Sequence, residues 1–366
     1  MKVGLKLKYL NVSLLILMVS ISCNTVKSNE GDGEGNVESC NGENWMVPCQ
    51  QIVDGGPGID GIPSIDDPNF TAADEVDFLE DWELVVGIKS GNETKAYPHV
   101  ILYYHEIVND SVGELPVALT FCPLTGSGIG WNRMIDGEVT EFGVSGLIHK
   151  NNLIPYDRNT GSRWSQMLNK SINGELSGRD VNIVQVVEMS WGAWKNAYPG
   201  SKVLNTDTGY NRNYSQYLYG RDYSSDDSRI LFPVYHNDER LNEKALVHGV
   251  KVGFNTKVYP IEEFGNQIEL INDEFEGEKI LVAGSSEIKL AVSYNRTLED
   301  GTVLNFSSID QGLPLLAEDQ EGTIWNIFGE AVSGPREGDK LTATGAYNAY
   351  WFAWADFFNF PQIHSF

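Results

Sequence analysis

Apolar and polar residues alternate in two similar segments of the chain, and in each segment the alternation continues on both sides of a Gly/Asn turn. The first segment runs from Val85 to Pro98 and the second from Val247 to Pro260. Alternation with a period of two is typical of half-buried strands, and a short turn rich in glycine and asparagine joins two such strands. Each segment is therefore predicted to form a β-hairpin.

The match between these segments continues along the chain at a spacing of about 160 residues. Each copy then ends in an aromatic segment with two tryptophans three residues apart, which places both rings on one face of a helix. We interpret these tryptophans as core residues of a short amphipathic helix rather than as a ligand platform. The matching positions are Gly161 to Trp164 with Gly322 to Trp325, Gly174 and Gly178 with Gly334 and Gly338, and Trp191 and Trp194 with Trp351 and Trp354.

Short alternating runs between these landmarks, such as residues 114–121 and 287–294, are predicted to be strands. The expected fold class is therefore mainly β with short helices (α+β), with two pseudo-symmetric β-rich repeats packed as one domain. The domain is expected over residues 56–366, with repeat 1 at about 78–199, a connector at 200–239 and repeat 2 at about 240–361. The connector is rich in Tyr and Asp, and loops of that length are often functional.

The N-terminal residues have the layout of a signal peptide. Lys2, Lys6 and Lys8 precede an apolar run that ends at Ser22, and this run is too short for a permanent membrane span. Cys23 comes directly after the small residue Ser22, which is where bacterial lipoprotein signals place the cysteine that is acylated. The segment resembles such a signal. We expect a signal peptide at 1–22, lipidation of Cys23 and a location in the cell envelope, on the periplasmic face or at the cell surface, with simple secretion as the alternative.

Residues 23–55 are rich in Gly, Asn, Glu and Ser, and they contain little that could form a core. We expect a flexible tether between the membrane and the domain. Cys40 and Cys49 lie close together in this segment, and export would place them in an oxidising compartment. They are predicted to form a disulfide.

The charge of the chain excludes one class of partner. The net charge is −25, from 51 acidic and 26 basic residues, and no Lys/Arg cluster interrupts the acidity. A protein that binds nucleic acid needs a basic surface to neutralise phosphates, so nucleic acid is not an expected partner. The acidity is that of a soluble surface-exposed protein.

Several blocks of the chain occur in a characteristic order: residues 55–68, Tyr97-Pro98, His105 to Asp110, Thr120 to Gly126, Phe142 to Gly146, and Tyr156 to Arg158 through Trp164 to Gln166. Together they resemble the family known as domain of unknown function 3179, from about Gly55 to the C-terminus. The resemblance implies a family and an architecture but no activity or cofactor. Members carry Cys-Pro-Leu-Cys-Gly where this chain has Thr125 in place of the second cysteine, which removes a Cys-x-x-Cys metal or redox pair.

Cys122 and His105 are the candidate catalytic residues. Cys122 follows a predicted strand and opens a Pro/Gly turn, and His105 precedes it by the distance of an adjacent hairpin. A thiolate beside an imidazole would be nucleophilic near neutral pH. The second repeat has neither residue, as expected if only the first kept a site. The alternatives are that Cys122 is a buried core residue and that His105 bonds the backbone.

His149, Asp157 and Arg158 are the candidate binding residues. His149 could act as a second base or a soft metal ligand, and Arg158 could bind an anionic group, although an Asp-Arg pair is as often a structural ion pair. Three functions follow from these candidates. The chain is a thiol-dependent enzyme, or a copper- or zinc-binding protein that uses Cys122, His105 and His149, or a lipoprotein that presents its connector, from Tyr210 to Tyr223, to a small molecule, glycan or peptide. Whether it is an enzyme stays open.

Overall fold

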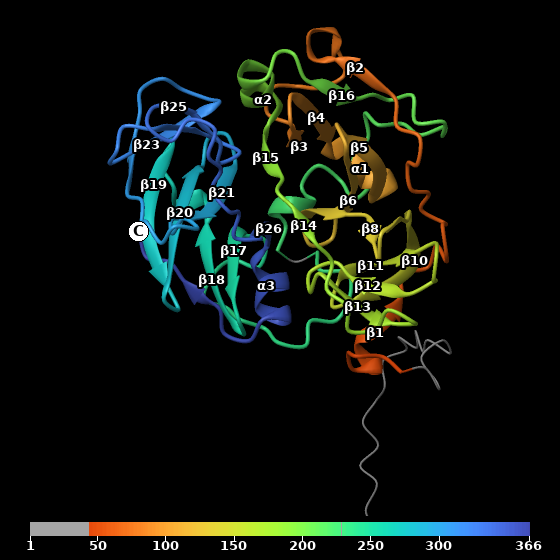
Figure 1. Ribbon diagram of the computed structural model, residues 1–366. Helices are drawn as coiled ribbons and strands as arrows, with labels where there is room; N and C mark the ends of the chain where they lie inside the picture. The colour runs from red at the N-terminus through yellow and green to blue at the C-terminus, as the bar shows by residue number, and fades with distance from the viewer. Residues whose placement is uncertain (1–43, 228) are drawn as a thin grey trace, which may run out of the picture. The chain divides into compact units, whose positions relative to one another are not determined.

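The protein is built of short strands and a few short helices. The computed structural model describes residues 44–227 and 229–366, and its described α-helices are α1 (His99–His105), α2 (Trp191–Ala197) and α3 (Trp351–Phe357) (Figure 1). The predicted fold class, mainly β with short helices, is confirmed. No helix in this part of the chain has both the length and the apolar character needed to span a membrane.

The first half of the chain forms three main sheets, and β8 (Met134–Ile135) and β9 (Glu138–Val139) form a small hairpin beside them. The first sheet has the order β15 (Val187–Ser190), β3 (Leu84–Ser90), β4 (Glu93–Pro98), β16 (Lys202–Leu204) and β2 (Phe70–Ala72). The second has β14 (Ile183–Val184), β7 (Ser127–Asn132), β6 (Leu115–Cys122) and β5 (Ile107–Val112). The third has β1 (Ile52–Asp54), β10 (Phe142–His149), β11 (Asn152–Asp157), β12 (Arg163–Ser165) and β13 (Lys170–Asn173).

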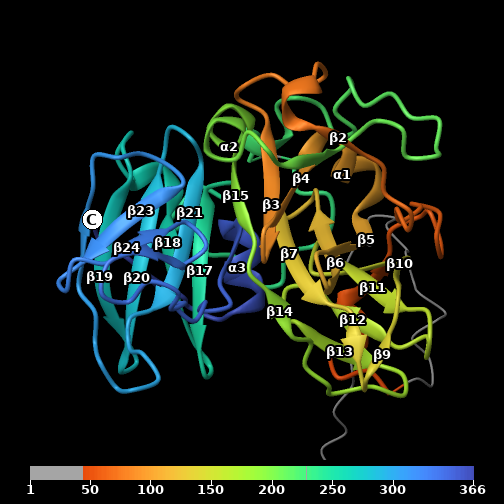
Figure 2. The same cartoon turned by 45° about the horizontal axis from the view of Figure 1, so that its top comes forward.

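The second half also forms three sheets (Figure 2). The first has the order β26 (Tyr347–Tyr350), β17 (Leu246–Val252), β18 (Asn255–Pro260) and β27 (Gln362–Ile363). The second has β19 (Glu269–Phe275), β20 (Glu278–Ser285) and β21 (Leu290–Asn295). The third has β22 (Phe306–Ser308), β23 (Leu315–Asp319), β24 (Ile324–Asn326) and β25 (Ala331–Ser333).

The strand orders of the two halves correspond. The hairpin β3–β4 pairs Val85 with Pro98, and the hairpin β17–β18 pairs Val247 with Pro260, so both predicted hairpins are present. β15 pairs with β3 and leads directly into α2, and β26 pairs with β17 and leads directly into α3. Both helices contain two tryptophans. We interpret these matching orders as two copies of one unit.

Matching polar contacts accompany the matching strands. Lys95 and Tyr97 on β4 both bond Asp110 on β5, and in the second half Lys257 and Tyr259 on β18 both bond Asp273 on β19. The Asp110 carboxylate thus connects the hairpin β3–β4 to the sheet that contains β5, and the Asp273 carboxylate connects the hairpin β17–β18 to the sheet that contains β19. A charge-assisted bond of this kind is stronger than a neutral one, so both halves connect two of their sheets by the same kind of strong contact.

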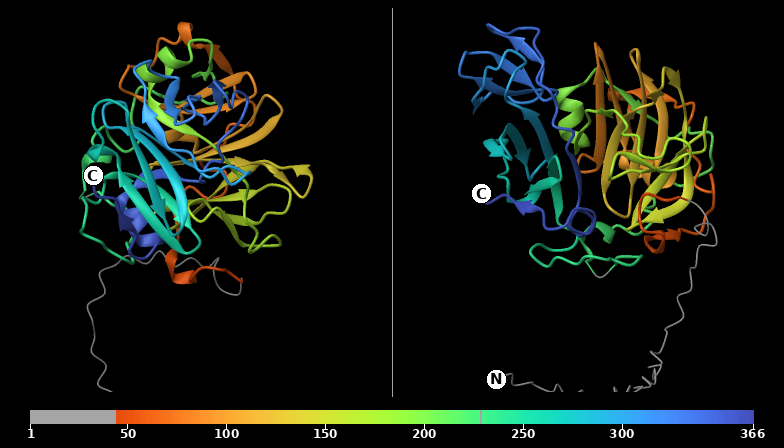
Figure 3. Two further views of the ribbon diagram at one scale, coloured as in Figure 1. Left: turned by 60° about the vertical axis from the view of Figure 1, so that its left-hand side comes forward. Right: turned by 60° about the horizontal axis from the view of Figure 1, so that its bottom comes forward.

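The two halves lie side by side (Figure 3). They bond each other through β15 and β26, the strands that lead into α2 and α3. The Ser190 amide at the end of β15 donates to the carbonyl of Ile288 at 2.9 Å, and the Tyr350 amide at the end of β26 donates to the carbonyl of Thr125 at 2.8 Å. Buried apolar residues of both halves also share clusters; Cys122 lies with Trp351, and Val85 with Trp325. The described residues, 44–227 and 229–366, accordingly belong to one compact unit.

The tryptophans of α2 and α3 are core residues, as expected. Trp191, Trp194, Trp351 and Trp354 are all fully buried. Trp194 lies directly on the backbone of β3, and a Cβ at Gly87 would lie 1.9 Å from its ring. Trp354 lies on β17 in the same way, since a Cβ at Gly249 would lie 2.0 Å from its ring. Only glycine leaves room for the indole at these two positions.

The predicted tether, residues 23–55, is wrong at its C-terminal end. Residues Ile52–Asp54 form β1, which pairs with β10, and the Ile52 side chain is buried against Ile154 and Ile172. Ile52 and Val53 are adjacent apolar residues between Gln51 and Asp54, and without alternation they gave too weak a pattern to predict a strand, although the edge of β10 offers a row of hydrogen-bond partners. The rest of the tether up to residue 43, the signal peptide and the lipidation site Cys23 lie outside the described residues.

The structure describes one of the two cysteines that are predicted to form a disulfide. Cys49 is disulfide-bonded, and Cys40, its predicted partner, lies outside the described residues. The pairing of Cys40 with Cys49 therefore stays a prediction.

Candidate functional site

Cys122 ends strand β6 and is buried in the core. Its thiol donates to the carbonyl of Asn151 at 3.6 Å, and only 1% of the residue is exposed. Burial raises the pKa of the Cys122 thiol to about 11, and the nearby Glu106 carboxyl adds to this effect. A nucleophilic cysteine needs the opposite shift, toward or below neutral pH. The environment of Cys122 thus favours the unreactive thiol.

The His105 side chain does not turn toward Cys122. Its Nδ1 lies 2.8 Å from the carbonyl of Pro63, and its Nε2 lies 2.6 Å from the Tyr214 hydroxyl. Because a carbonyl can only accept, Nδ1 carries the proton and Nε2 accepts from Tyr214. No hydrogen bond joins His105 to the thiol within the described ranges, and both ring nitrogens are occupied. The structure therefore does not assemble the predicted catalytic pair; His105 holds the connector in place instead.

His149 does not join these residues in a metal site. Its Nε2 lies 3.3 Å from Oε1 of Gln51, its ring packs against Phe357, and burial lowers its pKa to about 3. Among residues 44–227 and 229–366, no three or more His, Cys, Asp or Glu side chains are grouped so as to hold a metal ion. The proposed set of Cys122, His105 and His149 is therefore not brought together, because each side chain bonds a different segment.

Asp157 is occupied within its own turn. Its carboxylate accepts from Thr160 and, at 3.0 Å, from Nε1 of Trp164. In the second half Asp319 accepts from Nε1 of Trp325 at 2.9 Å. The same contact in both halves indicates that Asp157 stabilises a turn that the two halves share.

Arg158 is also occupied by the protein. Its Nη1 donates to Asp66 and to Glu141, both at 2.7 Å, and its Nη2 donates to Ser64 at 2.9 Å. A guanidinium that already bonds two carboxylates offers little attraction to a further anion. The alternative interpretation, a structural ion pair, describes Arg158 better, although its partners are Asp66 and Glu141 and not the adjacent Asp157.

We predict that Cys122 is unreactive in the folded protein. Iodoacetamide at neutral pH should leave Cys122 unmodified until denaturant is added, because the thiol is buried and its pKa is raised. Peptide mass spectrometry can read the modification at this site alone. The His105→Ala variant is the control, and it should give the same slow reaction. Rapid alkylation of native Cys122 that His105→Ala slows would instead restore the catalytic pair.

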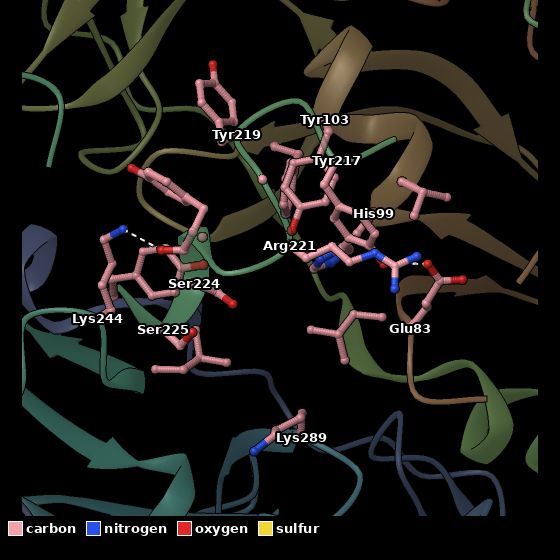
Figure 4. A pocket seen from close by; sticks show the side chains of 18 of the residues that line it. Glu83, His99, Tyr103, Tyr217, Tyr219, Arg221, Ser224, Ser225, Lys244 and Lys289 are labelled. Carbon is pink, nitrogen blue, oxygen red and sulfur yellow. Dashed lines mark hydrogen bonds between the residues drawn. The ribbon is translucent and has the colours of Figure 1, made fainter. Parts of the chain in front are cut away.

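A cavity of about 390 Å³ lies beneath the connector, and we call it the connector pocket (Figure 4). Its walls come from both halves and from the connector itself. The volume is within the usual range for small-molecule sites. Its main side chains are Trp82, Glu83, His99 and Tyr103, which lie before and on α1; Glu188 on β15; Tyr217, Tyr219, Arg221 and Tyr223 of the connector; and Lys244, Lys289 and Tyr350 of the second half.

Aromatic rings form much of the lining. Tyr217 stacks on Trp82 with ring centroids 6.4 Å apart and planes 16° apart, and its centroid lies 5.9 Å from that of Tyr103. Its hydroxyl donates to the Glu83 carboxylate at 2.5 Å. Tyr223 is buried deeper, with its hydroxyl 3.1 Å from the carbonyl of Leu124. The connector is thus attached to the first half by its tyrosines.

Lys244 holds the other end of the connector. Its ammonium group donates to the carbonyl of Tyr223 at 2.7 Å and lies 3.3 Å from the centroid of the Tyr223 ring. Burial lowers the pKa of Lys244 to about 8. At the opposite wall, Lys289 pairs with Glu262. These two cations of the pocket already have partners.

Two further polar side chains of the pocket face each other without a direct hydrogen bond. His99 and Glu188 are both buried, and Nε2 of His99 lies 3.8 Å from Oε2 of Glu188. Burial lowers the pKa of His99 to about 3; it raises the pKa of Glu188 to about 8, although the Asn348 side chain opposes that rise. Both groups are therefore mostly uncharged at neutral pH, and the contact is not an ion pair. Perturbed ionisable groups in a cavity are typical of functional sites.

Sequence analysis missed His99 and Glu188, although the chain carried a signal for both. At the matching positions of the second half stand Ile261 and Asn348. Ionisable residues that only one half carries point to a role that the shared fold does not require. The same comparison of the halves, which singled out Cys122 and His105, would have singled out these two residues as well.

The fold and the pocket define a class of protein: a mainly β domain with an aromatic cavity closed by a long connector. The chain belongs to the family described as protein of unknown function (DUF3179), whose model matches residues 59–362. The family resemblance stated from the sequence is thereby confirmed. No curated protein and no solved structure matches the chain.

Proposed function

We propose that this chain is an exported, lipid-anchored protein of the cell envelope that binds a small organic ligand in the connector pocket. The observation that carries the proposal is the position of the connector tyrosines. Tyr217, Tyr219 and Tyr223 line one side of a cavity whose other sides come from the two halves of the domain. A concave, largely aromatic site with a few polar groups is the common form of a small-molecule site. The layout of residues 1–23 supports export and lipidation.

This function fits the chain better than the two chemical alternatives do. A thiol-dependent enzyme needs an activated Cys122, whose pKa is raised, and a metal protein needs a ligand set that the described residues do not assemble. The connector pocket needs neither. Binding energy there can come from contact with aromatic rings, which bury large areas, and from the few polar groups that orient a ligand.

A thermal-shift screen of the full-length protein in detergent tests the proposal. The probes are neutral saccharides, tripeptides and small carboxylic acids at millimolar concentration. We expect at least one class to raise the melting temperature of the wild type, since a ligand that binds only the folded state stabilises it. Tyr217→Ala should lose most of this increase, because it removes the ring stacked on Trp82.

The matched control is Tyr210→Ala. Tyr210 belongs to the same connector, is exposed, and does not line the pocket. It should respond to the ligand as the wild type does. A stabilising ligand that acts equally on Tyr217→Ala, or a screen in which no class stabilises the wild type, would contradict the proposal.

A further inference from the structure

His99 leaves a buried polar atom unsatisfied. The residue begins α1 and is 6% exposed, and its Nε2 has no hydrogen-bond partner in the part of the chain that the structure describes. Its ring packs against Phe121, with centroids 4.5 Å apart, and meets the edge of Tyr103. A buried polar atom without a partner destabilises the fold. Because His99 lines the connector pocket, a ligand there can remove this cost.

Glu188 lies on the other side of the same gap. It is 4% exposed, and its Oε2 is 3.8 Å from Nε2 of His99. This distance is too long for a direct hydrogen bond, whose usual range is about 2.7–3.2 Å. It is short enough, however, for one oxygen atom to lie within hydrogen-bonding distance of both groups. The pair therefore has the spacing of a receptor for a single bridging atom.

The charge states of His99 and Glu188 determine which chemical group of a ligand can bridge them. An uncharged imidazole offers one donor and one acceptor, and an uncharged carboxylic acid offers one donor besides its acceptor oxygen. A hydroxyl group both donates and accepts, so it can donate to His99 and accept from Glu188. A carboxylate or phosphate would meet no positive charge at this position, and an ammonium group would meet no full negative charge.

The rest of the pocket suits a compact ligand with hydroxyl groups at its edges and apolar faces. Trp82, Tyr103 and Tyr217 present aromatic surface. The ammonium groups of Lys244 and Lys289 are occupied by protein partners, and the guanidinium of Arg221 lies over the Tyr217 ring, 5.6 Å from its centroid. We propose that the connector pocket binds a neutral saccharide, one hydroxyl of which lies between Nε2 of His99 and the carboxyl group of Glu188. This inference rests on the proposed function.

Calorimetric titration of the full-length protein with glucose, galactose, mannose, N-acetylglucosamine and their disaccharides tests the inference. For a sugar that binds, Glu188→Leu and His99→Phe should each weaken binding about tenfold or more, because one hydrogen bond is lost and its partner is left unpaired. Glu188→Gln should retain most of the affinity, since its amide can still donate to the hydroxyl. Among deoxy analogues, one should lose affinity for the wild type but bind Glu188→Leu about as well as the parent sugar does.

Two results would overturn the inference and leave the proposed function intact: Tyr217-dependent binding of tripeptides or acids without binding of any neutral sugar, and sugar binding that neither Glu188→Leu nor His99→Phe weakens. If no probe binds in a Tyr217-dependent way, both the inference and the proposed function fail. Circular dichroism of each variant checks that it is folded, and the exposed substitution Glu299→Gln serves as the matched control.

Discussion

Replacing Glu188 by glutamine should stabilise the protein at alkaline pH and change its stability little at acidic pH. Burial raises the pKa of Glu188 from 4.5 to about 8. Between these values the folded state keeps a proton that the unfolded state has lost, so the stability of the wild type falls as the pH rises through this window. The amide of the Glu188→Gln variant cannot ionise and escapes this loss. The difference in stability should be near zero below pH 4.5 and reach its maximum above pH 8.

The expected difference at pH 9 is on the order of a few kcal/mol, because a tenfold change in acid strength corresponds to about 1.4 kcal/mol. Melting curves of both proteins from about pH 4 to about pH 9 measure it. The exposed Glu299→Gln substitution is the control and should give a difference that does not depend on pH. A Glu188→Gln difference as flat as that of Glu299→Gln would show that Glu188 is charged in the fold.

Gly87→Ala and Gly249→Ala should each destabilise the domain by about 3 kcal/mol or more, near or above the upper end of the usual cost of overpacking. The added methyl group would lie 1.9 Å from the ring of Trp194 or 2.0 Å from that of Trp354. Both indoles are fully buried, so they cannot move aside without disturbing the core. Urea unfolding curves of the two variants measure the loss.

The matched control for this prediction is Gly200→Ala, since a Cβ at Gly200 meets nothing within 4 Å. That variant should be nearly as stable as the wild type. The double variant Gly87→Ala, Trp194→Phe should recover part of the loss, because the smaller ring leaves space for the methyl group. Near-neutral behaviour of Gly87→Ala would show that the close contact between β3 and Trp194 is not part of the stable fold.

The elements predicted correctly from the sequence depend on local patterns. The hairpins β3–β4 and β17–β18 are marked by alternation around a Gly/Asn turn, and both appear in the structure. The tryptophans of α2 and α3 are spaced for one helical face and are buried as expected. The strand expected at 287–294 is observed at Leu290–Asn295, because the residues before it form a turn. Local pattern fixes the type of an element better than its ends.

The candidate site was predicted less well because its contacts are not local. His105 and Cys122 lie on neighbouring elements, yet the partners of their side chains are Tyr214, Pro63 and Asn151. The spacing of residues in the sequence does not indicate which distant groups these side chains bond. The prediction that the connector is functional came from its length and its tyrosines, and three of these tyrosines do line the pocket. The walls opposite them come from segments that only the folded chain brings together.

The bonds of Ser190 to Ile288 and of Tyr350 to Thr125 join equivalent positions of the two halves in both directions. The amide at the end of β15, and likewise the amide at the end of β26, therefore has its hydrogen-bond acceptor in the other half. A shorter chain with one such half could satisfy that amide by meeting a second copy of itself about a twofold axis, where every contact is made twice. In this chain the two halves are covalently joined, so the two sides of the interface are free to differ, and His99 and Glu188 stand on one side only.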